Sequence, residues 1–308
     1  MLLLEERIFT RKNYKMAHQF PSEYDHEIYL NGHPDLQSAG FDTEGLYQHY
    51  VRHGKNEGRK ANSVTSREEF AALIPDGADI LEILPGFCPL CTGPRVNYFE
   101  INTKEELIIR AETLNVDSSK IRDVQYYQPN GDLTGINREF DFVVSSHVLN
   151  RQPDPIKHLQ QIENLLSDNG CLMMVLPDKR YSYDQNYPET TLTSVLVRHI
   201  EERTTPTSED YLAGSIMRTH TEADDHWSGN HGQTYPDLNE RLSTLKTVDH
   251  WNINGLPDRE ITTNTFTPDS FRTVMQILKD AGFIKMDVTR IYPTTFNKQE
   301  FYVILQCP

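Results

Sequence analysis

Basic clusters and long apolar runs are both scarce in this chain of 308 residues. Lysine and arginine total 30 against 45 aspartates and glutamates, and the net charge of −15 would repel a phosphate backbone, so we expect no nucleic-acid partner. The longest apolar run, Cys171 to Leu176, is far too short to cross a bilayer. The opening Met1 to Leu4 runs into acidic residues instead of a basic leader. We therefore expect a cytoplasmic protein without a transmembrane segment.

Cysteine is also rare, with four in the chain, and this limits the metal sites that it could build. Cys88 and Cys91 have the spacing of a zinc-binding pair. Cys171 lies in an apolar strand pattern and Cys307 at the end of the chain, so no second pair completes a site. We expect no structural metal at Cys88 and Cys91.

What the sequence does contain is a strand, a turn and a second strand between Ile80 and Glu100. In a doubly wound sheet the carboxyl ends of the first strands border a ligand crevice, and an acid that closes the second strand can bind two ribose hydroxyls. Glu100 holds that position, so the pattern indicates a nucleoside-bearing ligand. An ordinary buried strand and turn would have the same pattern, and Leu84 replaces the first glycine of a Gly-x-Gly turn.

From Ala72 onwards, strand and helix patterns alternate, which is typical of a parallel α/β sheet. Thr103 and Glu106 form a capping box for a helix that runs to about Leu114. Pro155 is expected at the first position of a later helix, which Asp168-Asn169-Gly170 ends. The expected strands are Ile80–Ile83, Val96–Glu100, 123–127, Phe140–Ser146, Cys171–Leu176, Ile284–Ile291 and Phe301–Leu305.

Two segments depart from this alternation. Residues 1–62 predict a small helical module, in which Leu46, Tyr47, Tyr50 and Val51 share one helical face. An upstream helix from Tyr24 to Leu36 is expected to be stopped by proline. Residues 63–308 form the main domain, with a mostly helical insertion over the crevice at about 185–265.

Several motifs, in one order, resemble class I S-adenosylmethionine-dependent methyltransferases. Ile80 to Pro89 resembles their Leu-Glu-Ile-Gly-Pro loop, and Phe140 to Pro155 resembles their Phe-Asp-x-Val-x-Ser-Ser-His-Val-x-Glu-His-x-Pro-Asp stretch. The further matching stretches are Leu176 to Asp184, His220 to Glu222, His226 to Gly232, Phe266 to Phe271 and Asn297 to Tyr302. Together they are similar to a subgroup associated with bacterial surface-polysaccharide biosynthesis. The early module likewise resembles one found in proteins of surface-polysaccharide assembly, where it would dock a glycan-assembly partner.

The resemblance implies a Rossmann-like seven-stranded sheet, a helical lid, and S-adenosylmethionine as cofactor. It implies cofactor-binding roles for Glu82, Leu84, Gly86, Glu100, Gly131, Asp132, Ser146 and His147. The acceptor would be a small molecule or glycan whose hydroxyl must be aligned and deprotonated. His147 and His226 are the expected bases, with His220 as a further catalytic candidate. The expected acceptor-binding residues are Asp178, Arg180, Tyr181, Trp227 and His231.

Some positions depart from the family pattern. Leu84 replaces a glycine that would let the cofactor approach the backbone, Asn150 and Arg151 replace a Glu-His pair, and Thr262 and Asn264 replace His and Trp. A catalytically degenerate relative that acts as a binding or scaffold component is therefore the alternative. The histidines from His220 to His231 leave three readings open: a metal site, as in a metal-dependent hydrolase, a substrate-binding lid, or hydrogen-bonded loop residues. Trp227, with Tyr235 and Trp251, could stack on a sugar ring or form the private core of the insertion.

Overall fold

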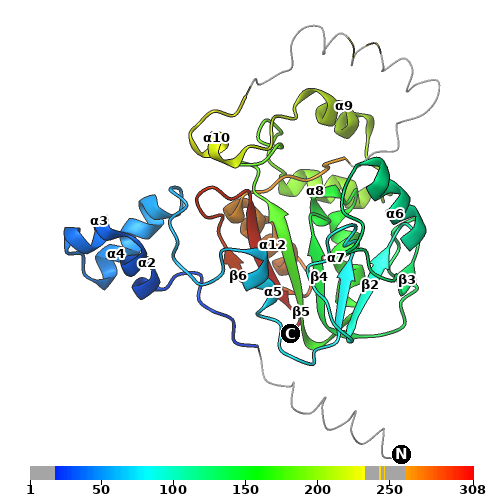
Figure 1. Cartoon of the computed structure of the whole chain (residues 1–308), viewed down its shortest axis with the longest axis horizontal. Coiled ribbons are helices and arrows are strands. Elements are labelled where there is room, and N and C mark those ends of the chain that lie inside the picture. The colour runs from blue at the N-terminus through cyan, green and yellow to red at the C-terminus, as the bar shows by residue number, and fades with distance from the viewer. Residues whose placement is uncertain (1–17, 233–242, 244–245, 247–260) are drawn as a thin grey trace, which may run out of the picture.

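The computed structural model describes residues 18–232, 243, 246 and 261–308. Its centre is a seven-stranded sheet with the strand order β3-β2-β1-β4-β5-β7-β6, shown in Figure 1. Strands β1 to β5 are parallel, and β7 runs antiparallel between β5 and β6. The strands are β1 Ile80–Ile83, β2 Val96–Glu100, β3 Tyr126–Tyr127, β4 Phe140–Ser146, β5 Leu166–Pro177, β6 Asp287–Tyr292 and β7 Glu300–Gln306. This confirms the predicted α/β, Rossmann-like sheet.

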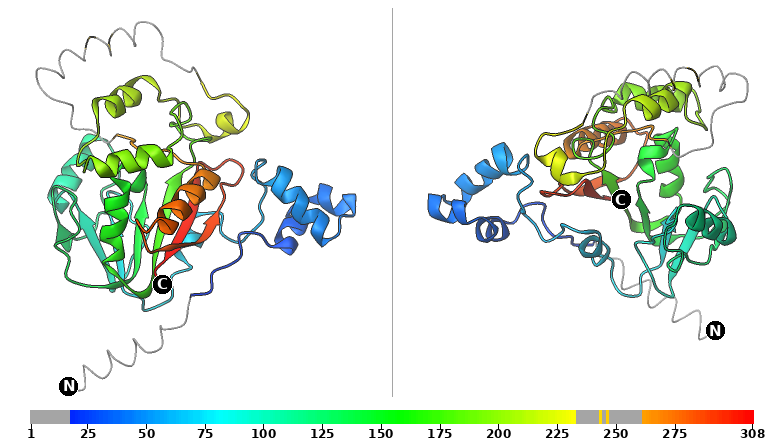
Figure 2. Two further views of the ribbon diagram at one scale, coloured as in Figure 1. Left: turned by 180° about the vertical axis from the view of Figure 1, so that it is seen from behind. Right: turned by 45° about the horizontal axis from the view of Figure 1, so that its top comes forward.

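Helices cover both faces of the sheet. Helices α7, α8 and α12 lie on one face of the sheet and α5 on the other (Figures 1 and 2). The larger core contains side chains of α7, α8 and α12, and the second core contains Phe70 of α5 together with Phe20. The helices of the sheet domain and its insertion are α5 Arg67–Ala71, α6 Lys104–Thr113, η2 Leu149–Arg151, α7 Pro155–Glu163, α8 Leu192–Ile200, α9 Ser208–Ile216, α10 Ala223–Trp227 and α12 Pro268–Asp280. In the described part of the chain, no helix combines the length and apolarity that crossing a membrane would need.

Strand β5 is buried on both faces of the sheet. Successive side chains of a strand point to opposite faces. Leu172 and Met174 belong to the larger core, whereas Met173 and Val175 belong to the second core. A continuous apolar run is what such a strand requires, and this is why the sequence pattern located it.

The start of β5 differs from the prediction. Helix α7 ends at Glu163, and Asp168-Asn169-Gly170, expected to end that helix, lies inside β5 instead. The strand begins at Leu166, which pairs with Phe140, and the register then shifts before Cys171 pairs with Phe142. Asn169 takes a left-handed φ of 61° within this irregular stretch. The turn-forming residues therefore produce a bulge rather than a helix cap.

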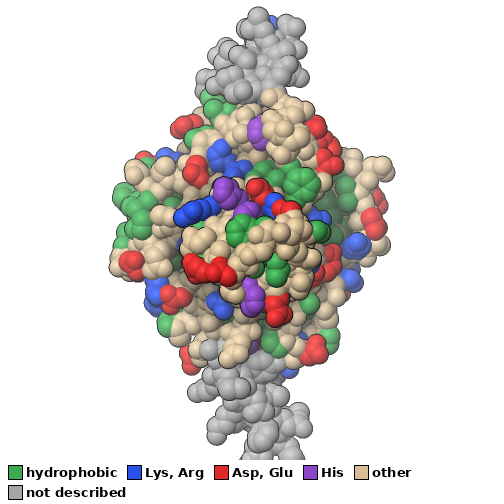
Figure 3. Space-filling view, turned by 90° about the vertical axis from the view of Figure 1, so that its left-hand side faces the viewer, with side chains coloured by type: hydrophobic (Ala, Val, Ile, Leu, Met, Phe, Trp, Pro, Cys, Tyr) green, Lys and Arg blue, Asp and Glu red, His purple; other side chains and the backbone are tan. Residues whose placement is uncertain are grey.

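The early helical module consists of α2 His26–Gly32, α3 Pro34–Ala39, α4 Thr43–His49 and the π-helix η1 Tyr50–Gly54. The predicted stop at proline is confirmed, because α2 ends before Pro34, but the same proline also opens α3 at its first position, which was not expected. Leu46 and Tyr50 are buried as expected, but Tyr47 and Val51 are exposed. Figure 3 shows that the face bearing this module mixes acidic, basic and histidine side chains.

The predicted helical insertion appears as α8, α9 and α10, and α9 and α10 lie beyond the carboxyl end of β5 (Figures 1 and 2). Segment 261–265 returns beneath them and is anchored to the turn after β4, since the amides of Thr263 and Asn264 donate to the Asn150 carbonyl at 2.8 and 3.0 Å. Tyr235 and Trp251 lie outside the described residues.

Candidate active site

The expected ligand crevice lies at the carboxyl ends of β1 and β2, where several features suit a nucleotide-like ligand. Glu100, which is only 2% exposed, accepts a hydrogen bond of 2.7 Å from the Gly86 amide. Gly86 has a left-handed φ of 57°, and a β-carbon there would meet no atom within 4 Å. Gly131 has a φ of 73°, and its nearest neighbour would be Ile101 at 3.9 Å. The two glycines thus leave room for a ligand beside a buried carboxylate.

Glu82 holds the loop after β1 in place. Its two carboxylate oxygens accept hydrogen bonds from the amides of Leu90 and Cys91, at 2.6 and 2.9 Å. Burial raises the pKa of Glu82 to about 7, nearby Glu100 acts in the same direction, and the two amides oppose the shift. These contacts give Glu82 a role in holding the loop, and its predicted contact with the cofactor stays a prediction.

Leu84 has the backbone conformation that a glycine would have. Its φ is 51°, in the left-handed region, and its side chain packs against the larger core. Its amide donates to the Phe99 carbonyl at 2.9 Å, which keeps the turn attached to β2. The side chain therefore contributes to the core while the backbone keeps the course of the turn.

This geometry predicts that Leu84→Gly will leave the affinity for S-adenosylhomocysteine within about threefold of the wild type, because the leucine side chain packs on the core. Gly86→Ala is the matched comparison, since its β-carbon enters the open crevice and should weaken affinity by roughly tenfold or more. Calorimetric titration of both variants measures the contrast. A large gain in affinity for Leu84→Gly would mean that the leucine blocks the site.

Asp132 and Ser146 occupy the edges of the crevice. Asp132 accepts from the Thr134 amide at 2.9 Å and from the Gln161 amide group at 2.8 Å. The Thr134 contacts are the main reason that its pKa is lowered. Its carboxylate therefore links the loop after β3 to α7, and its predicted place beside the adenine stays a prediction. Ser146 ends β4 and pairs with Val175.

His147 follows β4 and lies between this crevice and a second hollow. Its φ of 55° is strained for a residue with a side chain, and such strain concentrates at functional sites. Its Nε2 lies 2.6 Å from Oε1 of Glu300, the first residue of β7. Arg67 of α5 holds the same carboxylate with two nitrogens, one of them at 2.9 Å. Burial alone would raise the pKa of Glu300, but Arg67 and His147 outweigh it and lower that pKa to about 2.

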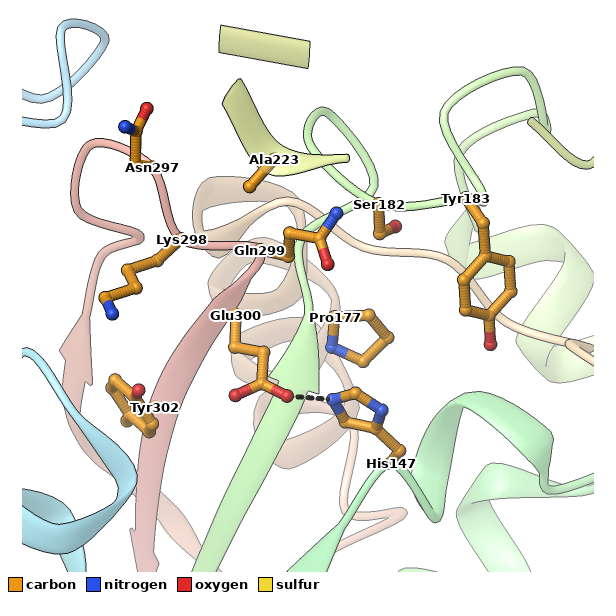
Figure 4. A pocket seen from close by; sticks show the side chains of 10 residues that line it. All are labelled: His147, Pro177, Ser182, Tyr183, Ala223, Asn297, Lys298, Gln299, Glu300 and Tyr302. Atoms are coloured by element: carbon orange, nitrogen blue, oxygen red, sulfur yellow. Dashed lines mark ion pairs between the residues drawn. The ribbon is translucent and has the colours of Figure 1, made fainter. Parts of the chain in front are cut away.

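A cavity of about 240 Å³ opens beside this pair, and Figure 4 shows the side chains that surround it. It lies where β4 and β5 end and β7 begins, with the lid on the opposite side. Polar side chains dominate the lining. The lining residues are His147, Pro177, Ser182, Tyr183, Ala223, Asn297, Lys298, Gln299, Glu300 and Tyr302.

The histidines of the lid form a hydrogen-bonded group outside that lining. Nε2 of His220 faces the Asn230 carbonyl at 3.0 Å, and Nε2 of His226 faces the His220 carbonyl at 3.1 Å. Nδ1 of His226 faces Nδ1 of His231 at 3.0 Å. A nitrogen that faces a carbonyl must carry the proton, so these contacts fix the tautomers. His226 is 1% exposed, and burial lowers its pKa.

This hydrogen bonding does not favour the catalytic and acceptor-binding roles expected for His220, His226 and His231. Their nitrogens bind one another and the backbone, so the lid histidines correspond to the hydrogen-bonded loop reading. Within the described residues, no group of three metal-ligating side chains converges. His147 is the expected base whose ring lines the cavity.

The expected acceptor-binding residues after β5 do not line the cavity either. Asp178 is fully buried, and it accepts from the Arg180 guanidinium at 2.7 and 3.0 Å and from the Thr294 hydroxyl at 2.7 Å. The rings of Tyr181 and Trp227 stack face to face, with their centroids 3.6 Å apart and their planes at an angle of 8°. These side chains therefore bind one another, and they pack behind the residues that line the cavity.

The sequence patterns assigned no role to two residues that hold His147 in place. Glu300 belongs to the stretch from Asn297 to Tyr302 that resembles the family, yet no role was assigned to it. Arg67 lies in no motif, and the nearest signal is Ser66, which caps α5. Because 233 positions separate Arg67 from Glu300, no local pattern could have joined them.

Comparisons with known proteins give structural neighbours and one family match. Among curated proteins, none matches the chain. The structure is similar to an S-adenosylmethionine-dependent methyltransferase from Clostridium acetobutylicum ATCC 824, with 12% identity, coverage of 74% of this chain and 83% of that chain, and a TM-score of 0.38. It is also similar to one from Mesorhizobium loti, with 15% identity, coverage of 78% and 98%, and a TM-score of 0.39.

With TM-scores this low, assignment to a family depends on sequence alone. Residues 50–214, just over half of the chain, match a family described as a methyltransferase domain. The match includes the crevice, β4 with His147, and the first part of the lid. The chain therefore belongs to the methyltransferase domain family.

Proposed function

We propose that this protein uses S-adenosylmethionine to methylate a hydroxyl of a small polar acceptor held beside His147. The observation that carries the proposal is the position of His147, which lies between the glycine-lined crevice and the polar cavity and whose Nε2 is 2.6 Å from Glu300. A methyl donor in the crevice and an acceptor in the cavity would meet at this residue. Holding two reactants in such a geometry is the main catalytic task in methyl transfer.

The crevice residues fit the proposed cofactor. Glu100 is placed to accept hydrogen bonds from ribose hydroxyls, and the open space beside Gly86 and Gly131 admits the rest of the molecule. When bound, S-adenosylmethionine supplies an electrophilic methyl group on its sulfonium. Glu82 keeps the surrounding loop in place through the Leu90 and Cys91 amides.

His147 is suited to remove the hydroxyl proton. Nε2 of His147 lies 2.6 Å from the ionised Glu300 without an aligned hydrogen bond. A proton on Nε2 would face the carboxylate and would leave Nδ1 as the proton acceptor. Glu300 then stabilises the imidazolium that forms when Nδ1 takes the proton. Arg67 in turn keeps Glu300 ionised and oriented.

The acceptor that we favour is a saccharide or nucleotide-sugar of cell-surface glycan biosynthesis, methylated in the bacterial cytoplasm. The cavity of about 240 Å³ lies below the roughly 300–1,000 Å³ of pockets for drug-sized ligands, which suits one sugar ring. Ser182, Tyr183, Asn297 and Gln299, all labelled in Figure 4, carry groups that would hydrogen-bond to ring hydroxyls. The link to glycan biosynthesis rests on the resemblance of the motifs.

Calorimetric titration of S-adenosylmethionine and S-adenosylhomocysteine into cofactor-free protein tests the proposal. We expect micromolar binding, about −8 kcal/mol, and roughly tenfold or more weaker binding for Glu100→Gln, since a carboxylate that binds hydroxyls is lost. Asp123→Asn is the control, because that exposed acid pairs with Lys104 away from the crevice. No binding to the wild type would reject the methyltransferase activity.

The degenerate alternative has one observation in its favour. The two polar side-chain atoms of Asn150 and the hydroxyl of Thr262 are buried without a hydrogen-bond partner, and both residues stand where the resembling sequences have other side chains. Such groups indicate a site that has drifted from its former chemistry. Under that reading the crevice would bind a partner or glycan but not the cofactor, and the same titration distinguishes the two functions.

A further inference from the structure

Gly58, near the end of the early module, lies against Trp227 of the lid and the backbone of Phe296. Its φ is 64°, and a β-carbon there would lie 2.4 Å from the Trp227 ring and 2.5 Å from the Phe296 nitrogen. The Gly58 carbonyl accepts a hydrogen bond of 2.8 Å from the Phe296 amide. Both the conformation and the space therefore require glycine at this position.

Trp227 connects this contact to the cavity. Its Nε1 donates to the carbonyl of Lys298, a cavity-lining residue, at 2.8 Å. One face of its ring stacks on Tyr181, whose hydroxyl donates to the Asn56 carbonyl at 3.4 Å. The turn at Asn56 and Gly58 thus contacts both rings of the stacked pair.

The loop between β6 and β7 is the wall of the cavity that these contacts reach. Asn297, Lys298 and Gln299 are consecutive and all line the cavity, and Glu300 follows directly (Figure 4). Gln299 also donates to the Thr221 carbonyl of the lid at 2.8 Å. The loop is therefore held by the lid through Thr221 and Trp227, and by Gly58 through the Phe296 amide.

We propose that the turn 55–58 supports the acceptor site from behind its wall, with Gly58 as a positioning residue that sets the Asn297–Gln299 wall and hence the placement of Glu300 beside His147. Lys55 secures the turn to the sheet domain through an ion pair of 2.9 Å with Asp269. The early module then shapes the acceptor cavity in addition to any docking role. This inference rests on the proposed function, because it concerns the cavity that the acceptor would occupy.

Gly58→Ala tests the proposal, and Gly40→Ala is its matched control. Gly40 lies in the same module with a φ of 68°, but a β-carbon there would meet nothing within 4 Å. Both variants therefore carry similar backbone strain, and only Gly58→Ala adds a steric clash. In full-length protein we expect amide hydrogen exchange of residues 294–300 to be roughly tenfold faster in Gly58→Ala and unchanged in Gly40→Ala. Modification of His147 by diethyl pyrocarbonate, followed by mass spectrometry, should be faster in Gly58→Ala and unchanged in Gly40→Ala.

Trp227→Phe provides a second variant should Gly58→Ala fail to fold. It keeps an aromatic ring on Tyr181 but removes the donor to Lys298, so exchange should again rise in 294–300. Affinity for S-adenosylhomocysteine should stay at the wild-type value in all folded variants, because the crevice lies at β1 and β2. Equal exchange and equal His147 modification in Gly58→Ala and Gly40→Ala would overturn the inference. Failure of the wild type to bind S-adenosylhomocysteine would instead reject the proposed function.

Discussion

Replacing His147 with glutamine is expected to lower the rate of methyl transfer by roughly a hundredfold to ten-thousandfold, the usual contribution of a general base. The Nδ1 of His147 is the proposed proton acceptor, and glutamine has no group that can take a proton there. Binding of S-adenosylhomocysteine should change by less than about threefold, since the crevice contacts of Glu100 and Gly86 remain. The measurement is the turnover of S-adenosylmethionine with a sugar acceptor found by screening, together with calorimetry of the cofactor.

His226→Gln is the matched control for that experiment. His226 was an equal candidate from the sequence, but its ring nitrogens face His231 and the His220 carbonyl. We expect the folded His226→Gln protein to keep a rate within about tenfold of the wild type, since no ring nitrogen of His226 faces the cavity. A greater loss of rate in His226→Gln than in His147→Gln would contradict the assignment of the base.

The sequence predicted the sheet well because local patterns carry most of that information. Strand β5 is apolar on both faces, and Thr103 with Glu106 forms the expected capping box at α6. Glu100 was located because an acid at the end of the second strand has a fixed place in this topology. Such features depend on residues near one another in the chain.

The predictions were less successful where distant segments meet. Tyr181 and Trp227 were both expected to bind the acceptor, yet they stack on each other because the lid folds back over the turn after β5. The ring of His226 has the same chemistry as that of His147, and only the fold decides which one faces the cavity. Arg67 and Glu300 come together from opposite ends of the domain, and their pairing follows from the antiparallel insertion of β7 beside β5.

Glu300→Gln should reduce the free energy of unfolding at pH 7, and this difference should shrink as the pH falls from 4.5 towards 2. The pKa of Glu300 falls from 4.5 to about 2 in the folded protein, which corresponds to roughly 3 kcal/mol. Because the folded pKa is lowered, the stabilisation is fully present above the unfolded value of 4.5 and is lost as the pH falls towards 2. Urea unfolding of both proteins between pH 7 and pH 3 measures the change.

Arg67→Met and the double variant identify the source of this stabilisation. Arg67 is the first of the groups that lower the pKa of Glu300, and the carboxylate in turn raises the pKa of Arg67. The two single changes should therefore be non-additive at pH 7, by about 1 to 3 kcal/mol, and become additive as the carboxyl group is protonated. A difference between wild type and Glu300→Gln that stays constant from pH 7 to pH 3 would show that Glu300 is not held ionised. In that case the carboxylate could not stabilise a protonated His147, and the proposed base would lose its partner.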